Sequence, residues 1–239
     1  MFEDFGYEVA RWDLARYRAR ALQDSFTVFD REWTLLPEVW PGNAVATKLF
    51  TAWLPYEDAA SFLEVGCGAG VTSVTAALRG CSRVCALDIN AAAVENSRLN
   101  AERHGVQDRV STLKSDLFSG LGPSDRFDLV YWNSPYADAP PGHAYDSQLD
   151  YAVFDADYVM HQRYFADAYR HLTDGGRLFL GFSNALGNGS RLREVAAMAG
   201  FTGSVFRREV FSFAIDVPGV RTSDSETEVD YVLYEFRRA

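Results

Sequence analysis

A glycine-rich turn and three carboxylates follow segments whose composition is typical of buried strands. The turn lies in LEVGCGAG, at residues 63–70. The acids are Glu64 within it, Asp88 in ALDIN and Asp116 in SDLF. Glycines let a backbone turn tightly and come close to a ligand, and parallel strands end at the edge of a sheet where α/β folds bind ligands. The pattern therefore predicts a binding crevice onto which the three acids project.

The chemistry predicted for this crevice is that of a nucleoside. Asp88 lies 22 residues after Gly66, where a carboxylate can accept hydrogen bonds from both hydroxyls of a ribose. Asp116 precedes Leu117, and an acid beside an apolar residue suits an adenine amino group and its ring. The turn reads E-x-G-x-G-x-G and is not a dinucleotide fingerprint, because Val71 stands where that pattern has Gly or Ala. Turn and cap roles are the alternative explanation for these acids.

The stretch FDLVYWNSPY, at residues 127–136, is the second feature with chemical potential. Its apolar and aromatic run is strand-like, and Pro135 ends the strand in a turn. An amide, a hydroxyl and a phenol come together there, in Asn133, Ser134 and Tyr136. A strand-ending turn with a core tyrosine is the alternative reading.

An alternation of short apolar strands with helices positions these residues. Strands are predicted at 61–66, 82–88, 109–116, 127–133 and 177–184, and helices at 71–80, 91–105, 161–176 and 191–199. Such alternation indicates βαβ units and a mostly parallel sheet with helices on both faces. Two late β segments, around 204–215 and 229–236 and joined by PGVRTSDSETE, predict an antiparallel hairpin at one edge. The predicted fold class is α/β.

The N-terminal part lacks this alternation. Residues 1–24 predict a helix, residues 26–39 a β-like aromatic segment, and NAVATKLFTAWL at 43–54 a further helix. We therefore expect residues 1–36 to form an N-terminal extension of one helix and a short β segment, and residues 37–239 to form the main domain.

Together these motifs resemble those of class I S-adenosylmethionine (SAM)-dependent methyltransferases. Residues 64–70 match the first motif of that family, Asp88 its ribose-binding acid and Asp116 its adenine-contacting position. The resemblance covers about residues 37–239 and implies a Rossmann-like, seven-stranded, mostly parallel sheet with a C-terminal antiparallel hairpin. It implies SAM as cofactor, S-adenosylhomocysteine as product, and Glu64 near the methionine amino group. The cofactor-binding residues expected from it are Glu64, Gly66, Cys67, Gly68, Gly70, Asp88, Ile89, Asn90, Asp116, Leu117 and Asn133.

NSPY resembles the (D/N/S)-P-P-(Y/F/W) motif of N-methyltransferases, among them enzymes that act on adenine N6, on guanine N2 of ribosomal RNA and on a release-factor glutamine. The resemblance implies that the Asn133 side-chain oxygen and the next backbone carbonyl each accept an N–H of a planar NH2 group, on which Tyr136 stacks. Asn133, Ser134, Pro135 and Tyr136 are thus the expected catalytic residues. Ser134 replaces a proline, which frees an N–H, adds a hydroxyl and is expected to loosen the turn.

The loop at 137–157 is long and acidic, and loops of this kind after a reactive strand end often close over a substrate. The residues expected to contact the substrate are Tyr136, His143, Tyr145 and Trp40. His143 could accept a proton, with a solvated loop histidine as the alternative.

Charge and composition restrict the partners. A net charge of −10 over 239 residues disfavours a nucleic-acid substrate, because such binding usually needs a basic stripe. No apolar run is long enough for a membrane span and no signal peptide is recognisable, so we expect a cytoplasmic protein. Three cysteines without framework spacing predict neither disulfides nor a metal site. A homodimer is one open alternative for the oligomeric state.

The leading hypothesis is a SAM-dependent methyltransferase acting on an amino or amide nitrogen of a small molecule or peptide side chain. A ribosomal RNA or release-factor methyltransferase is the alternative among enzymes. A regulatory protein that binds SAM without catalysis is the alternative from another class.

Overall fold

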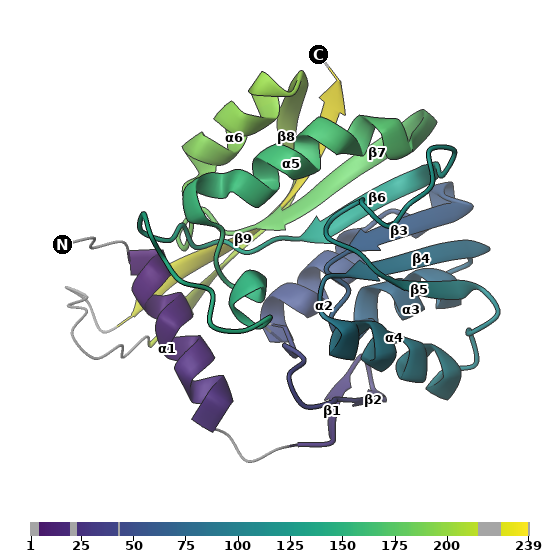
Figure 1. Ribbon diagram of the computed structural model, residues 1–239, viewed down its shortest axis with the longest axis horizontal. Helices are drawn as coiled ribbons and strands as arrows, with labels where there is room; N and C mark the ends of the chain where they lie inside the picture. The colour runs from purple at the N-terminus through teal and green to yellow at the C-terminus, as the bar shows by residue number, and fades with distance from the viewer. Residues whose placement is uncertain (1–4, 20–22, 43, 215–225, 239) are drawn as a thin grey trace.

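A single twisted sheet of seven strands forms the centre of the computed structural model, which describes residues 5–19, 23–42, 44–214 and 226–238 (Figure 1). The strand order is β5-β4-β3-β6-β7-β9-β8. The strands are β3 (Ser61–Val65), β4 (Arg83–Asp88), β5 (Val110–Lys114), β6 (Phe127–Asn133), β7 (Leu172–Phe182), β8 (Phe201–Phe213) and β9 (Thr227–Arg238). The first five pair in parallel, whereas β9 lies antiparallel to both β7 and β8. The predicted α/β fold with its antiparallel hairpin is confirmed.

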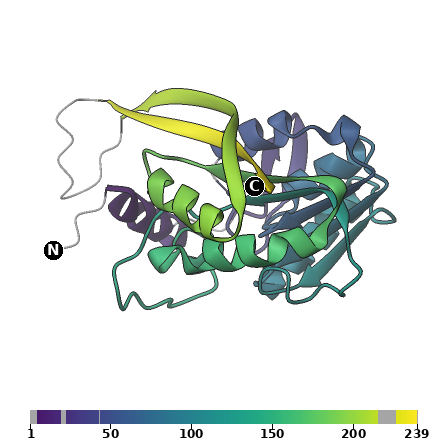
Figure 2. The same ribbon diagram turned by 90° about the horizontal axis from the view of Figure 1, so that it is seen from above.

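Helices cover both faces of this sheet (Figure 2). One face packs against α2 (Ala44–Trp53), α3 (Val71–Leu78) and α4 (Ala91–Arg103), and the other against α5 (Val159–Ala168) and α6 (Gly189–Met198). Side chains alternate between the two cores along each strand, as Phe62 and Leu63 do on β3. Burial on both faces explains why these strands are continuously apolar in the sequence. Short 3-10 helices lie at Tyr56–Asp58 (η1), Asp150–Ala152 (η2), Ala156–Tyr158 (η3) and Tyr169–His171 (η4).

The N-terminal residues form α1 (Phe5–Ala19) and a hairpin of β1 (Ser25–Val28) and β2 (Arg31–Thr34). The hairpin is fixed to α4, where Asn100 Oδ1 accepts a hydrogen bond from the Thr34 N–H at 2.8 Å. Helix α1 lies beside the loop at 137–157 (Figure 1), and the two share a small apolar cluster centred on Leu14 and Phe154. Of the helix expected at 1–24, residues 1–4 and 20–22 lie outside the described residues, and the expected C-terminal end is wrong because Gln23 and Asp24 are not helical.

The segment before β7 differs from its prediction. The helix expected to run to Gly176 ends at Ala168, and the chain enters β7 at Leu172 after one 3-10 turn. Leu172 pairs with Phe127, and the register then shifts before the pairing resumes. A Cβ on Gly176 would lie 2.9 Å from the Phe127 carbonyl oxygen, so the glycine permits this irregular pairing rather than ending a helix.

Candidate active site

The glycine turn joins β3 to α3 in a conformation that other residues rarely adopt. Gly66, Gly68 and Gly70 have φ of 65°, 52° and 81°. A Cβ on Gly70 would lie 2.4 Å from the Ser97 hydroxyl oxygen. The glycines are therefore required both for the turn and for the close approach of α3 to α4.

Glu64, on β3, is buried beneath this turn with 3% of its surface exposed. It accepts hydrogen bonds from the Ser73 N–H, at 2.8 Å, and from the Ser73 hydroxyl. Burial raises the pKa of the Glu64 carboxyl to about 8, although the bonds from Ser73 and Thr72 oppose the shift. The group is therefore mostly protonated at pH 7.

Asp88 ends β4 next to the same turn. One carboxylate oxygen accepts the Gly68 N–H and the other accepts the Asn90 N–H, each at 2.9 Å. Burial raises the pKa of Asp88, and these backbone donors oppose the shift. Asn90 in turn caps α4, because its side-chain oxygen accepts the Ala92 N–H at 2.9 Å. Asp88 thus holds two neighbouring loops in place and keeps lone pairs free for a ligand.

Asp116 follows β5 and is about half exposed. It forms an ion pair with Arg163 of α5 at 2.8 Å, a partner that the sequence pattern did not identify. Leu117, with φ of 50°, turns the chain directly after it. Glu64, Asp88 and Asp116 all line one cavity at the carboxyl ends of the strands.

The end of β6 lines the same cavity with residues 133–136. The Tyr136 hydroxyl donates a hydrogen bond to the Asn133 side-chain oxygen at 3.2 Å. The Tyr136 ring packs edge-on against Phe182, with ring centroids 5.7 Å apart. Burial raises the pKa of the Tyr136 phenol, so this hydroxyl remains a donor at neutral pH.

Ser134 anchors the turn rather than loosening it, so that expectation was wrong. Its N–H and its hydroxyl both donate to the Gly181 carbonyl of β7, at 3.3 Å and 3.1 Å. Asn133 and Gly181 are register partners, which brings this carbonyl within reach. The side chain of Ser134 is buried by these contacts.

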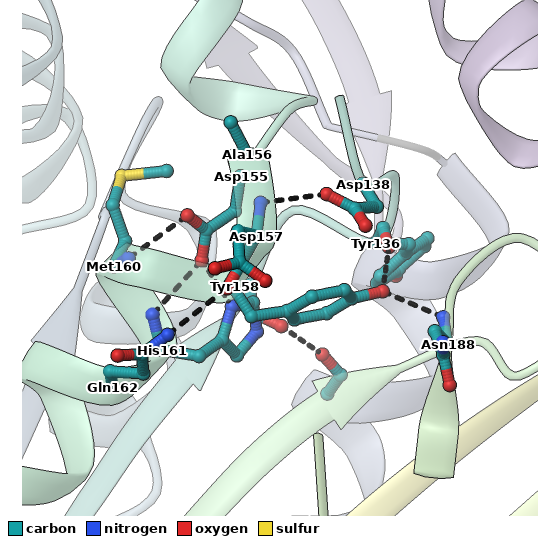
Figure 3. A network of polar contacts seen from close by, with 12 residues as sticks. Tyr136, Asp138, Asp155, Ala156, Asp157, Tyr158, Met160, His161, Gln162 and Asn188 are labelled. Carbon is teal, nitrogen blue, oxygen red and sulfur yellow. Dashed lines mark hydrogen bonds and ion pairs between the residues drawn. The ribbon is translucent and has the colours of Figure 1, made fainter. Parts of the chain in front are cut away.

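A polar network holds the backbone that follows Tyr136 (Figure 3). The Tyr158 hydroxyl donates to the Tyr136 carbonyl at 2.8 Å and accepts the Asn188 N–H at 2.6 Å. Behind it, the buried Asp155 carboxylate lies 2.6 Å from Nδ1 of His161 and accepts the His161 N–H at 2.9 Å. The end of β6 is therefore held in place by η3, directly before α5, and by the segment before α6.

The outer wall of the cavity comes from segments far apart in the sequence. Helix α1 contributes four lining residues, the loop contributes its 148–153 segment, and Trp40 lines the cavity as predicted. The α1 residues are Gly6, Val9, Ala10 and Asp13. The sequence pattern missed them, because an inward helix face can be assigned to a cavity only when its packing partner is known.

His143 and Tyr145, two expected substrate contacts, are not among the lining residues. His143 lies between Tyr7, Tyr145 and Phe154, and its Nδ1 is 3.3 Å from the Tyr7 hydroxyl oxygen. Tyr145 stacks on Tyr151 with ring centroids 4.4 Å apart, and its hydroxyl accepts the Ala156 N–H. In the structure both residues pack against other residues of the loop, and His143 also contacts Tyr7 of α1.

Cys67, Cys81 and Cys85 are buried free thiols. Among the described residues, no group of three or more His, Cys, Asp or Glu side chains could hold a metal ion. Within the same residues, no helix has the length and apolarity that a membrane crossing requires.

Comparisons with known proteins agree with this geometry. Residues 43–201 match the family model "Methyltransferase small domain". The chain is 38% identical over 96 residues to the release factor glutamine methyltransferase of Chlorobaculum tepidum, which covers 37% of this chain and 32% of that enzyme. It is 32% identical over 166 residues to the ribosomal RNA small subunit methyltransferase C of Escherichia coli, which covers 66% of this chain and 43% of that enzyme. The chain thus spans less than half the length of these curated relatives.

Among solved structures, a 16S rRNA N2 methyltransferase of T. thermophilus in complex with AdoMet and guanosine has a similar fold. The TM-score is 0.58 at 20% identity, and the match covers 92% of this chain and 50% of that one. The predicted resemblance to SAM-dependent methyltransferases is confirmed. Since the family match extends over more than half of its residues, the chain belongs to the methyltransferase small domain family.

Proposed function

We propose that this protein is a SAM-dependent N-methyltransferase acting on an amino or amide nitrogen of a small molecule or peptide side chain. One observation carries the proposal. The NSPY turn, with two acceptors suited to a planar NH2 group, lines the same cavity as the glycine turn, Glu64 and Asp88.

The residues of the cavity fit SAM. Gly68 lets the turn lie close to the Trp40 backbone, because a Cβ there would lie 3.3 Å from the Trp40 carbonyl oxygen. Asp88 would accept the two ribose hydroxyls, Glu64 would lie near the methionine amino group, and Asp116 with Leu117 would contact the adenine. When bound, SAM supplies an electrophilic methyl group, and transfer leaves S-adenosylhomocysteine and one proton released from the acceptor nitrogen.

The Asn133 side-chain oxygen and the Ser134 backbone carbonyl would orient the acceptor. The lone pair of a conjugated NH2 group is delocalised, which makes the nitrogen a poor nucleophile. Two acceptors that each take one N–H hold the nitrogen in place and favour a more pyramidal geometry. They also stabilise the positive charge that develops on the nitrogen during transfer. The Tyr136 hydroxyl fixes the Asn133 oxygen for this task.

Charge supports a small or cationic acceptor over a nucleic acid. The chain carries a net charge of −10. No lysine, arginine or histidine occurs among the described residues that line the cavity. A glutamine amide of a protein is the second candidate, because relatives named release factor glutamine methyltransferases align with this chain and an amide NH2 group suits the NSPY turn.

The test is a transfer assay with methyl-labelled SAM and a lysate separated into RNA, protein and small-molecule fractions. We expect label in the small-molecule or protein fraction. Label confined to RNA would favour a ribosomal RNA substrate. No label in any fraction, with cofactor binding intact, would favour the non-catalytic alternative.

Asn133→Ala tests the assigned chemistry. Loss of one preorganised acceptor should lower kcat by about a hundredfold. Calorimetry should show a much smaller loss of SAM affinity for this variant than for Asp88→Ala. Unchanged turnover in Asn133→Ala would refute the role given to the NSPY turn.

A further inference from the structure

Asp13 is a carboxylate on the inward face of α1. Residues on one face of a helix recur every three or four positions. On this face of α1, Gly6, Val9 and Leu14 are buried. Asp13 lines the cavity together with Val9, one turn earlier in the helix. Asp13 is partly buried there, so a partner would compensate for the part of its hydration that the carboxylate loses.

Of the arginines in the described part of α1, only Arg16 lies near enough for its charge to act on Asp13, and none forms an ion pair with it. Arg11 pairs with Glu8 at 3.3 Å, and Arg18 pairs with Asp150 at 2.9 Å. The Arg16 guanidinium stacks on Trp12, 4.2 Å from the ring centroid. Among the described residues, Asp13 therefore makes no hydrogen bond or ion pair within the usual contact distances.

The electrostatic surroundings do not favour an unpaired carboxylate. Burial raises the pKa of Asp13, and the nearby charge of Arg16 offsets only part of this shift. Asp88 lines the same cavity as a second carboxylate, and no basic side chain does so within the described chain. The aromatic rings of Trp40, Tyr136 and Tyr151 line it as well. Acids and aromatic faces are the groups that bind organic cations.

We propose that Asp13 is a specificity-determining residue that binds a cationic nitrogen group, an ammonium or amidinium, on the methyl acceptor. The acceptor would thus be a small organic cation enclosed by α1 and the 148–153 segment. Its second nitrogen, the planar NH2, would face Asn133. This inference rests on the proposed function, because it takes the cavity beyond the cofactor residues to be the acceptor site.

The experiment compares benzylamine with benzyl alcohol, two probes of similar shape that differ in charge, on protein saturated with S-adenosylhomocysteine. Calorimetric or NMR titration gives both affinities. We expect the wild type to bind benzylamine at least about tenfold more tightly, as a charge-assisted hydrogen bond would provide. Asp13→Asn should abolish this preference and leave the affinity for S-adenosylhomocysteine unchanged. Glu8→Gln, which removes the same charge from the same helix outside the cavity, should retain the preference.

Three results would overturn the inference. The first is that the wild type binds benzylamine no more tightly than benzyl alcohol. The second is that Asp13→Asn still binds benzylamine more tightly than benzyl alcohol. The third is that Asp13→Asn loses affinity for S-adenosylhomocysteine. The last result would assign Asp13 to the cofactor. Because these titrations involve no methyl transfer, a failure of the labelled-SAM assay alone would refute the proposed function and not the cation site.

Discussion

Glu64 shows how one buried side chain can link cofactor binding to a proton. Burial raises its folded-state pKa from 4.5 to about 8. In the free protein, the stabilisation due to Glu64 is therefore fully present below about pH 4.5 and is lost as the pH rises through about 8. The ammonium of a bound amino acid moiety would favour the charged carboxylate and reverse this shift.

We therefore expect SAM binding at pH 7 to release up to about one proton from Glu64. Calorimetric titrations in buffers with different ionisation enthalpies measure this release directly. Glu64→Gln is the matched control, because an amide oxygen can still accept the Ser73 bonds but no proton can leave. Identical binding enthalpies in all buffers for the wild type would contradict the linkage.

The contribution of the Ser134 contacts to stability can be tested by restoring the proline that the related motif has at this position. Ser134→Pro removes the N–H and the hydroxyl that bind the Gly181 carbonyl but keeps the backbone carbonyl assigned to the acceptor. We expect a loss of about 1–2 kcal/mol of stability, or roughly 2–8 °C in Tm, with methyl transfer retained. Ser134→Ala, which removes the hydroxyl alone, should lose about half as much stability. A variant that is as stable as the wild type by thermal unfolding would show that the Gly181 contacts contribute nothing.

At the scale of elements, the sequence predicts what depends on local pattern. The glycine turn and Asp88 could be located because strand ends and the following helices follow from the apolar runs alone. The contacts of Ser134 could not, because they require the register that pairs Asn133 with Gly181. Asp13 was missed for a similar reason, since only the packing of α1 on the loop gives its helix an inward face.

The pairing of α1 with the loop is itself testable through Arg18. Its guanidinium donates to Asp150 and to the Ser147 hydroxyl, each at 2.9 Å. In Arg18→Ala, Asp150 keeps its bonds from Ser147, so we expect global stability to fall by no more than about 1 kcal/mol. Hydrogen exchange should instead become faster in α1 and at 147–153, with β3 and β6 unchanged.

Arg11→Ala is the control for this experiment, because in the described part of the chain Arg11 contacts charged and aromatic partners within α1 alone, namely Glu8 and the ring of Tyr7. It should leave exchange in the loop at the wild-type rate. Equal exchange in Arg18→Ala and Arg11→Ala would mean that the Arg18 pair does not hold the outer wall of the cavity together.

At the scale of the molecule, net charge bears on a choice of substrate that the fold leaves open. The same sheet and the same motifs match relatives named for ribosomal RNA and for release factors. Most of the described arginines lie in ion pairs with acids, as Arg98 does with Glu95 and Glu102. Such pairing offsets part of the positive charge that would otherwise neutralise phosphates.

We therefore expect no saturable binding to a 16S ribosomal RNA fragment, even at low salt, where non-specific affinity is greatest. Fluorescence anisotropy with labelled RNA measures this, with the Escherichia coli ribosomal RNA small subunit methyltransferase C as the positive control. Repulsion between the RNA and a chain of net charge −10 gives the physical reason. Tight binding that weakens steeply with added salt would show that phosphate contacts form despite this charge, and would make ribosomal RNA the leading acceptor.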